Sequence, residues 1–440
     1  MMMKAKFVIV AMLVSLGAGA QEKWTLRQCV EHALDNNIEI KQREIALDRQ
    51  EIEVHTAKFR RLPNLGARAG QSFSYGRVAS PLDNTYFDRN TRNTSFEAAT
   101  SVSLFSGMQI THNIALAKLN LDAAMEDLKK AREDVSMQVT SLFLQVLFAE
   151  EISKVAAAQL KVSEAQHHRM KRLHEVGKAS TSVFYETKSR LAQDRVTAVQ
   201  AENNRKLALL DLSQILELSS PELFAIVAPD MEPTFELLTP PQDIYDIAVV
   251  SKPIVRAAQH RVAGAERSIR IAQSALYPQL EFAAGITTGY YTVANFDSPS
   301  FSSQFTNNMN KSFGFTLTIP IFNRMETRDK VKSARLQMQN QSFMLDAAKK
   351  ALFKEIQQAY YSAIAAQSTY LSSATAVEAA EESYRLTERK YEEGKATGVE
   401  FNEVKTLLQK AVSDRIQAKY DYLFRLKILD YYKGIPIVLE

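Results

Sequence analysis

Two glycine-lysine pairs in helical surroundings, Gly177-Lys178 and Gly394-Lys395, are the residues that first suggest chemistry. A phosphate-binding loop requires an earlier glycine at fixed spacing and a preceding strand, and neither pair has them. His167 and His168 are adjacent, so they point in different directions on a helix, and no Cys or third His stands at ligand spacing. The sequence therefore predicts no catalytic, cofactor or metal site, and we expect a protein that is not an enzyme.

The carboxylates after the second pair permit two interpretations. Glu400 and Glu403 lie three residues apart and share one helix face, where their charges could act together. Thr397 and Glu400 also fit a capping box, in which the glutamate serves only the start of a helix. Both interpretations remain open at this point.

Each of the two glycines interrupts a long helical pattern. Gly177 and Gly394 stand where a left-handed backbone ends a helix, so a plain C-cap is one interpretation. The exposed end of a helical hairpin is also a natural contact surface for a partner. The sequence therefore predicts two hairpin tips, near 177–181 and 394–398.

The same unit occurs twice in the chain, displaced by about 215 to 217 residues. In each copy a helix ends, two strands follow, and a long helix leads to one of the two tips. The predicted organisation is a signal peptide at 1–20, a first repeat over 21–218 with strands at 65–76 and 95–105, a connector over 219–241, a second repeat over 242–432 with strands at 280–291 and 312–321, and a C-terminal tail over 433–440. Five prolines forbid a continuous helix in the connector.

The four predicted strands alternate between large apolar and small polar residues, which indicates a sheet with two different faces. At about 9 to 11 residues they match a tilted crossing of a bilayer better than an average globular strand. Asn, Asp and Ser are frequent in 77–92 and 292–311, which predicts polar loops there. Because about eight strands are the fewest that close a barrel, four strands imply oligomerisation.

Apolar residues in the predicted helices recur at spacings of three, four or seven, which is typical of coiled coils. The predicted buried seam of the first repeat is Leu121, Met125, Leu128, Val135, Val139, Leu142, Val146 and Ala149. An uninterrupted helix from Met108 to Val176 would extend roughly 100 Å at 1.5 Å per residue. We therefore expect a protein that spans a distance.

The first residues indicate export. Lys4 and Lys6 precede an apolar run from Phe7 to Leu16, and Ala18-Gly19-Ala20 is a small-x-small cleavage site. Cleavage there would leave 52 Lys+Arg against 50 Asp+Glu, a balance that gives no support to nucleic acid as a partner. The single Cys29 excludes an internal disulfide framework.

Together, the export signal, the duplicated strand-strand-helix-turn-helix unit and the two Gly-Lys-Ala turns resemble the TolC-like outer-membrane efflux proteins. The second tip carries the resemblance best, over Tyr391 to Glu400 with Glu403 three residues on. The resemblance implies a mainly α protein with a transmembrane β-barrel portion: three protomers form a 12-stranded barrel, continued by a long α-helical periplasmic tunnel. It further implies an exit duct of a tripartite efflux or type I secretion system, with a periplasmic adaptor protein, an inner-membrane pump and outer-membrane lipid as partners, and no cofactor.

The resemblance also implies roles for particular residues. The expected periplasmic aperture consists of Glu400, Glu403, Tyr391 and Glu186, and the expected adaptor contacts are Gly177, Lys178, Gly394 and Lys395. Val183 departs from the family pattern, because an acidic residue is common there. We therefore expect closure of the aperture to depend on the second hairpin.

A periplasmic adaptor or other coiled-coil scaffold of an export complex is the alternative function. Such an adaptor would contain one hairpin flanked by small β-domains. The two hairpins and two strand pairs predicted here favour the channel.

Overall fold

The computed structural model describes residues 22–79, 86–88, 90–218, 224–228, 235, 238–294 and 297–435. The expected signal peptide and part of the predicted connector lie outside these ranges. The chain divides into two compact units. Unit 1 comprises the described residues of 1–42 together with Lys129–Lys252 and 350–440, and unit 2 comprises Arg43–Leu128 and Pro253–Lys349. Each unit therefore draws residues from both predicted repeats.

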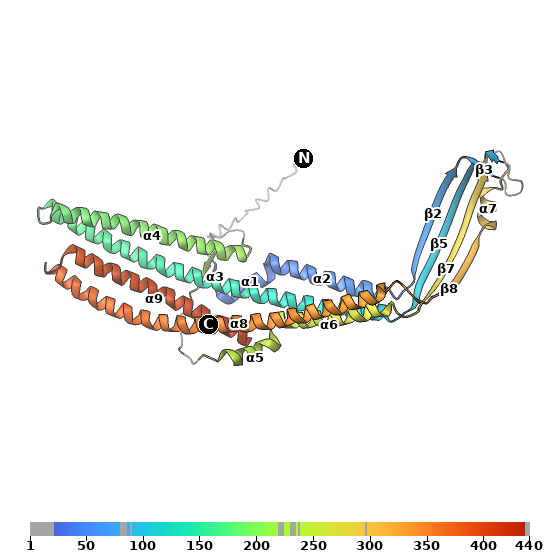
Figure 1. The fold of residues 1–440 in the computed structure, drawn as a ribbon. Coiled ribbons are helices and arrows are strands. Elements are labelled where there is room, and N and C mark those ends of the chain that lie inside the picture. Colours follow the sequence, from blue (N-terminus) through green and yellow to red (C-terminus); the bar gives the residue numbers. More distant parts are fainter. Residues whose placement is uncertain are drawn as a thin grey trace, which may run out of the picture. The chain divides into compact units, whose positions relative to one another are not determined.

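Unit 2 contains a four-stranded antiparallel sheet (Figure 1). Its strands, in spatial order, are β2 (Asn64–Ser74), β5 (Thr91–Ser106), β7 (Gln279–Val293) and β8 (Asn310–Thr318). The last strand ends at Thr318 and not at the predicted residue 321, because Pro320 has no N–H to donate to a ladder. The edges of the sheet are β2 and β8.

The sheet has one apolar face and one small polar face. In the register of β7 with β8, Phe282 lies opposite Phe315, whereas Gly285 lies opposite Ser312. Phe313 keeps 80% of its surface exposed in the single chain, and Leu65 keeps 83%. Phe315 and Leu317 of β8 are exposed as well. A contiguous apolar surface of this kind marks a site of contact with a membrane or with another protein.

The predicted polar loop at 292–311 is wrong, because this segment contains helix α7 (Phe301–Asn307). The Ser300 hydroxyl accepts the backbone N–H of Ser303 at 3.3 Å, which caps the helix. Phe305 of α7 then packs on Phe96 of β5, with 5.7 Å between ring centroids. The predicted loop after β2 holds a short antiparallel pair, β3 (Arg77–Ala79) with β4 (Tyr86–Asp88).

Helix α6 (Pro253–Ser274) packs closely on the part of α3 (Gln109–Glu175) that lies in unit 2. A Cβ on Gly264 would come within 3.2 Å of Leu116, so the glycine permits the close approach of the two helices. Arg256 of α6 lies 3.2 Å from the buried carboxylate of Glu126 on α3. Helix α2 (Ile38–Phe59) lies mainly in the same unit.

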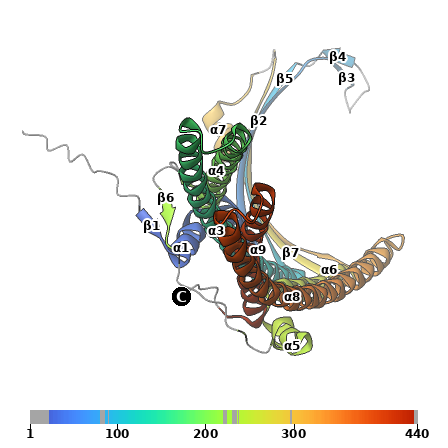
Figure 2. The same cartoon turned by 90° about the vertical axis from the view of Figure 1, so that its left-hand side faces the viewer.

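Unit 1 is built on two helical hairpins. The first joins α3 to α4 (Thr181–Ile215), and the second joins α8 (Glu326–Glu392) to α9 (Gly398–Lys433). Figures 1 and 2 show α4 lying alongside α3 and α9 alongside α8. Val139 and Val146 of the predicted seam are fully buried, whereas Leu142 is half-buried and its neighbour Phe143 is fully buried instead. Ile356 and Tyr422 of the second hairpin are fully buried as well. Among the described helices, none is both long and apolar enough to cross a membrane.

A small parallel sheet in unit 1 joins the start of the described chain to the connector. Strand β1 (Glu22–Trp24) pairs with β6 (Phe224–Ile226), and α1 (Leu26–Asn36) follows β1 directly. The Trp24 ring packs edge-on against Phe224 at 5.4 Å between centroids. After the connector, α5 (Pro241–Ser251) begins with a proline in its first turn. Three-residue strands are too short to show periodicity, which is why the sequence did not predict this sheet.

Candidate functional site

The two hairpin tips share one backbone design. We call residues 167–190 the first tip and the equivalent residues 384–407 the second tip. Gly177 has φ of 74° and Gly394 has φ of 72°, the left-handed region that favours glycine. In both tips the residue after the glycine donates its N–H back to the helix, Lys178 to Leu173 and Lys395 to Lys390, at 2.7 Å each. These bonds satisfy terminal carbonyls of the helix, so both glycines act as C-caps.

Both tips are also closed by a stacked pair of rings. His174 stacks on Phe184 with centroids 5.1 Å apart, and Tyr391 stacks on Phe401 at 4.8 Å. The predicted aperture residue Tyr391 is thus a packing residue of its own tip. Sequence reasoning missed the role of the two phenylalanines, although the ten-residue spacing of each pair is the same in both copies.

The helices restart differently at the two tips. At the second tip, Thr397 Oγ1 accepts the N–H of Glu400 at 3.3 Å, and Glu400 Oε2 accepts the N–H of Thr397 at 2.8 Å. This capping box lowers the pKa of Glu400, chiefly through the backbone hydrogen bond from Thr397. At the first tip, Ser180 caps Val183 without a reciprocal carboxylate. Glu403 lies exposed on α9 and takes no part in the capping box.

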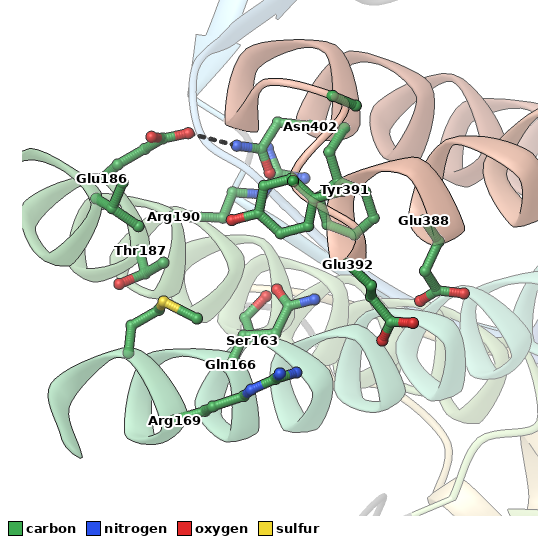
Figure 3. A pocket seen from close by; sticks show the side chains of 15 residues that line it. Ser163, Gln166, Arg169, Glu186, Thr187, Arg190, Glu388, Tyr391, Glu392 and Asn402 are labelled. Atoms are coloured by element: carbon green, nitrogen blue, oxygen red, sulfur yellow. Dashed lines mark hydrogen bonds between the residues drawn. The ribbon is translucent and has the colours of Figure 1, made fainter. Parts of the chain in front are cut away.

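A hydrogen bond joins the two tips within one chain. Asn402 Nδ2 on α9 donates to Glu186 Oε1 on α4 at 2.7 Å (Figure 3). The same carboxylate lies over Gly398, where a Cβ would meet its oxygens at 3.1 and 3.2 Å. A carboxylate beside the first residue of α9 also interacts favourably with the helix dipole. The structure therefore places the predicted residue Glu186 in contact with Asn402, a residue that the sequence did not single out.

A cavity of about 370 Å³ lies between the two hairpins near this bond (Figure 3). Helices α3, α4, α8 and α9 all contribute to its wall. The charged lining residues are Arg169, Glu186, Arg190, Glu388 and Glu392. Tyr391 lines the cavity as well, whereas Glu400 and Glu403 do not, so the structure brings together only two of the four predicted aperture residues.

A buried polar layer lies next to the cavity. Asp194 on α4 is 6% exposed and accepts a hydrogen bond from Gln159 at 3.0 Å and another from the Ser163 hydroxyl, both on α3. Arg190 Nε lies 3.4 Å from Asp194 Oδ1, an ion pair that lacks hydrogen-bond geometry. Arg190 Nη2 instead donates to Gln409 on α9 at 3.0 Å, which extends the layer to the second hairpin.

Lys405 of α9 completes this layer. Its side chain is buried, and Nζ lies 3.5 Å from Gln166 Oε1 on α3. Burial lowers the pKa of Lys405, and the charge of Asp194 opposes this effect. The layer therefore holds one acidic and two basic side chains from both hairpins, with amides and a hydroxyl between them.

Comparison with known proteins connects this arrangement to a family. The family model described as "Outer membrane efflux protein" matches residues 29–217 and 244–430. The chain is 22% identical to outer membrane protein TolC of Escherichia coli over 94% of this chain and 83% of TolC. It is 20% identical to the alkaline protease secretion protein AprF of Pseudomonas aeruginosa, over 70% of this chain and 63% of AprF, less than two thirds of that protein's length.

A solved structure supports the same fold. The outer membrane protein VceC of Vibrio cholerae superposes with a TM-score of 0.74 at 17% identity, covering 93% of this chain and 96% of VceC. At that identity the likeness concerns the fold. The predicted fold class, mainly helical with a duplicated strand and hairpin unit, is thereby confirmed.

Proposed function

Because the chain belongs to the outer membrane efflux protein family, we propose that it is the outer-membrane exit duct of a tripartite efflux or type I secretion system. In this role it passes small molecules or exported substrates from an inner-membrane pump to the outside. The relatives named above work in protease secretion or carry the outer-membrane designation in their names.

The observation that carries this proposal is the sheet of unit 2. Its apolar side chains are exposed in the single chain, and its edge strands β2 and β8 are open to further pairing. Unpaired strand edges are too costly in lipid, because no water satisfies their backbone groups. Three copies that join edge to edge would give a closed 12-stranded barrel whose apolar face meets lipid and whose polar face lines the passage.

The hairpins supply the periplasmic part of the duct. The tips around Gly177, Lys178, Gly394 and Lys395 are the proposed contacts for a periplasmic adaptor protein, since they are the exposed ends of the hairpins. The proposed periplasmic aperture consists of Tyr391, Glu186, Glu400 and Glu403. The hydrogen bond from Asn402 to Glu186 supports a closed state in which one hairpin holds the other.

Cell fractionation and gel migration test the proposal together. The full-length protein should be found in the outer membrane, migrate as a trimer in unheated SDS gels, and form pores in planar bilayers. A monomer that stays in the soluble fraction would contradict the duct and favour a periplasmic scaffold.

A further inference from the structure

The two tips have the same backbone but differ in charge: the first is basic and the second is balanced. They share the glycine C-cap, the stacked ring pair and the return hydrogen bonds described above. The first tip contains six Lys or Arg against two Glu, together with three His, whereas the second contains five Lys or Arg against five Glu. Because the backbone is the same, the difference in charge is not needed to form the turn.

Five of the six cations of the first tip are exposed, namely Arg169, Lys171, Arg172, Lys178 and Lys188. The sixth, Arg190, belongs to the buried polar layer and pairs with Asp194. Within the described ranges no carboxylate forms an ion pair with any of the five; Lys188 lies over the Tyr185 ring, 5.9 Å from its centroid. At the second tip, by contrast, Lys395 lies 2.7 Å from Glu393.

The helix starts add to this difference. Helix α4 has no acidic residue in its first turn, whereas α9 has Glu400 there. The N-terminal end of a helix carries a partial positive charge, which is therefore left uncompensated at the first tip. His167 responds to these surroundings: burial lowers its pKa first, and the charges of His168, Lys171 and Lys188 lower it further.

We infer that the first tip is an electropositive docking surface for an acidic helical segment of the periplasmic partner. The second tip, which is also a proposed contact of that partner, does not bind this acidic segment. The inference rests on the proposed function, which places a partner at the tips. The cations lie on α3, in the turn and on α4, so they are spread over both arms of the hairpin. A helix that lies along the hairpin can reach cations on both arms, whereas a flat anionic surface would meet only its end. Complementary charges at such a surface mainly speed association and select the partner.

Binding of a defined probe tests the inference. The probe is a fluorescein-labelled helical peptide with glutamate along one face, titrated by anisotropy against the purified full-length protein in detergent. Replacing both Arg172→Gln and Lys178→Gln should weaken binding roughly fivefold, at about 0.5 kcal/mol for each exposed charge pair. Binding should also disappear at about 1 M salt, where the Debye length is roughly 3 Å.

The duplicated unit supplies a matched control. Arg389→Gln with Lys395→Gln makes the same changes at the equivalent positions of the second tip. Lys395 is a proposed contact of the adaptor, but affinity for the acidic peptide should stay within about twofold of the unchanged protein. Lys171→Glu introduces the residue type found at the equivalent position, Glu388, and should weaken binding further. Circular dichroism of each variant should show unchanged helix content.

Three results would overturn the inference. They are equal losses from substitutions in either tip, binding that ignores salt, and binding of phosphatidylglycerol vesicles in place of the peptide, which would identify a lipid surface. Pore formation in planar bilayers by the same samples tests the proposed duct function independently of the docking surface. A protein that binds the peptide at the first tip but forms no pore would contradict only the duct.

Discussion

At the second tip the Glu400 carboxylate accepts the N–H of Thr397 at 2.8 Å and its hydroxyl at 3.1 Å. Both bonds are stronger to the ionised carboxylate, which is why they lower the pKa of Glu400. The local task of this residue is to begin α9. Any contribution to an acidic aperture would come in addition to that task.

The capping box predicts a pH-dependent start of α9. The pKa of Glu400 is lowered in the folded chain, so its stabilising effect is present above the pKa of an unfolded glutamate and is lost as pH falls through the lowered value. Amide hydrogen exchange, corrected for its intrinsic pH dependence, should show loss of protection at residues 398–401 in that acidic range. Glu400→Ala should expose these amides at neutral pH as well, whereas Glu403→Ala should not. Equal protection in all three proteins would contradict the prediction.

The local features of the tips could be predicted from sequence, and the contacts between them could not. A glycine C-cap and a capping box depend on residues three to six positions apart, so the roles of Gly394, Thr397 and Glu400 can be recognised from the local sequence. The bond from Asn402 to Glu186 joins residues 216 positions apart. Only the packing of the two hairpins brings these two side chains together.

At the scale of elements, the predicted heptad seam of α3 is buried along unit 1, where only Leu142 is half-buried, and it is interrupted at Met125 in unit 2. Val135, Val139 and Val146 are buried, but Met125 is 39% exposed. The neighbouring residue Glu126 is buried in its place because Arg256 of α6 pairs with it. An apolar pattern cannot reveal a buried ion pair whose partner comes from another helix.

The buried polar layer predicts opposite effects for its acidic and basic members. Asp194→Ala should lower the free energy of unfolding by about 3 kcal/mol, because Ser163 and Gln159 would lose their acceptor and Arg190 would lose its ion-pair partner. Lys405→Met should be neutral or stabilising, because burial lowers the pKa of Lys405 and so penalises its charged form. Thermal unfolding of the detergent-solubilised protein measures both effects.

The pH dependence of stability tests whether the charge of Lys405 destabilises the folded chain. Its folded pKa lies below the unfolded value, so the unfolded chain binds more protons between the two values and stability rises with pH there. Lys405→Met should remove that rise. Destabilisation by Lys405→Met equal to that of Asp194→Ala would instead show that the two form an essential pair.

At the scale of the whole molecule, adjacent residues of the edge strand β8 predict which side of the sheet faces lipid. Phe315 lies on the apolar face, opposite Phe282, and Thr316 lies on the polar face, opposite Glu281. Phe315→Lys should reduce insertion and trimer recovery, with a cost of about 2–4 kcal/mol for a charge near the bilayer midplane. Thr316→Lys should assemble normally, as measured by unheated SDS gels of outer-membrane fractions. Equal recovery of both variants would contradict the proposed orientation.

The general architecture could be predicted because duplication repeats every landmark, so that two weak signals support each other. Helix α7 and the β1–β6 pair are not part of the duplicated unit, so no second copy in the sequence supports their prediction. Helix α7 is seven residues long in a polar segment, and its position depends on Phe301 and Phe305 packing on the sheet. The short parallel pair depends on contact between residues about 200 positions apart.

The shared backbone of the two tips has a consequence for symmetry. A ring of three copies would present six turns of nearly one geometry, a pseudo-sixfold rim, on which basic and balanced turns alternate. A partner that recognised only shape could settle on that rim in six rotational settings. One that is drawn to the basic turns can settle in three, so the difference in charge would fix the rotational alignment of the two rings.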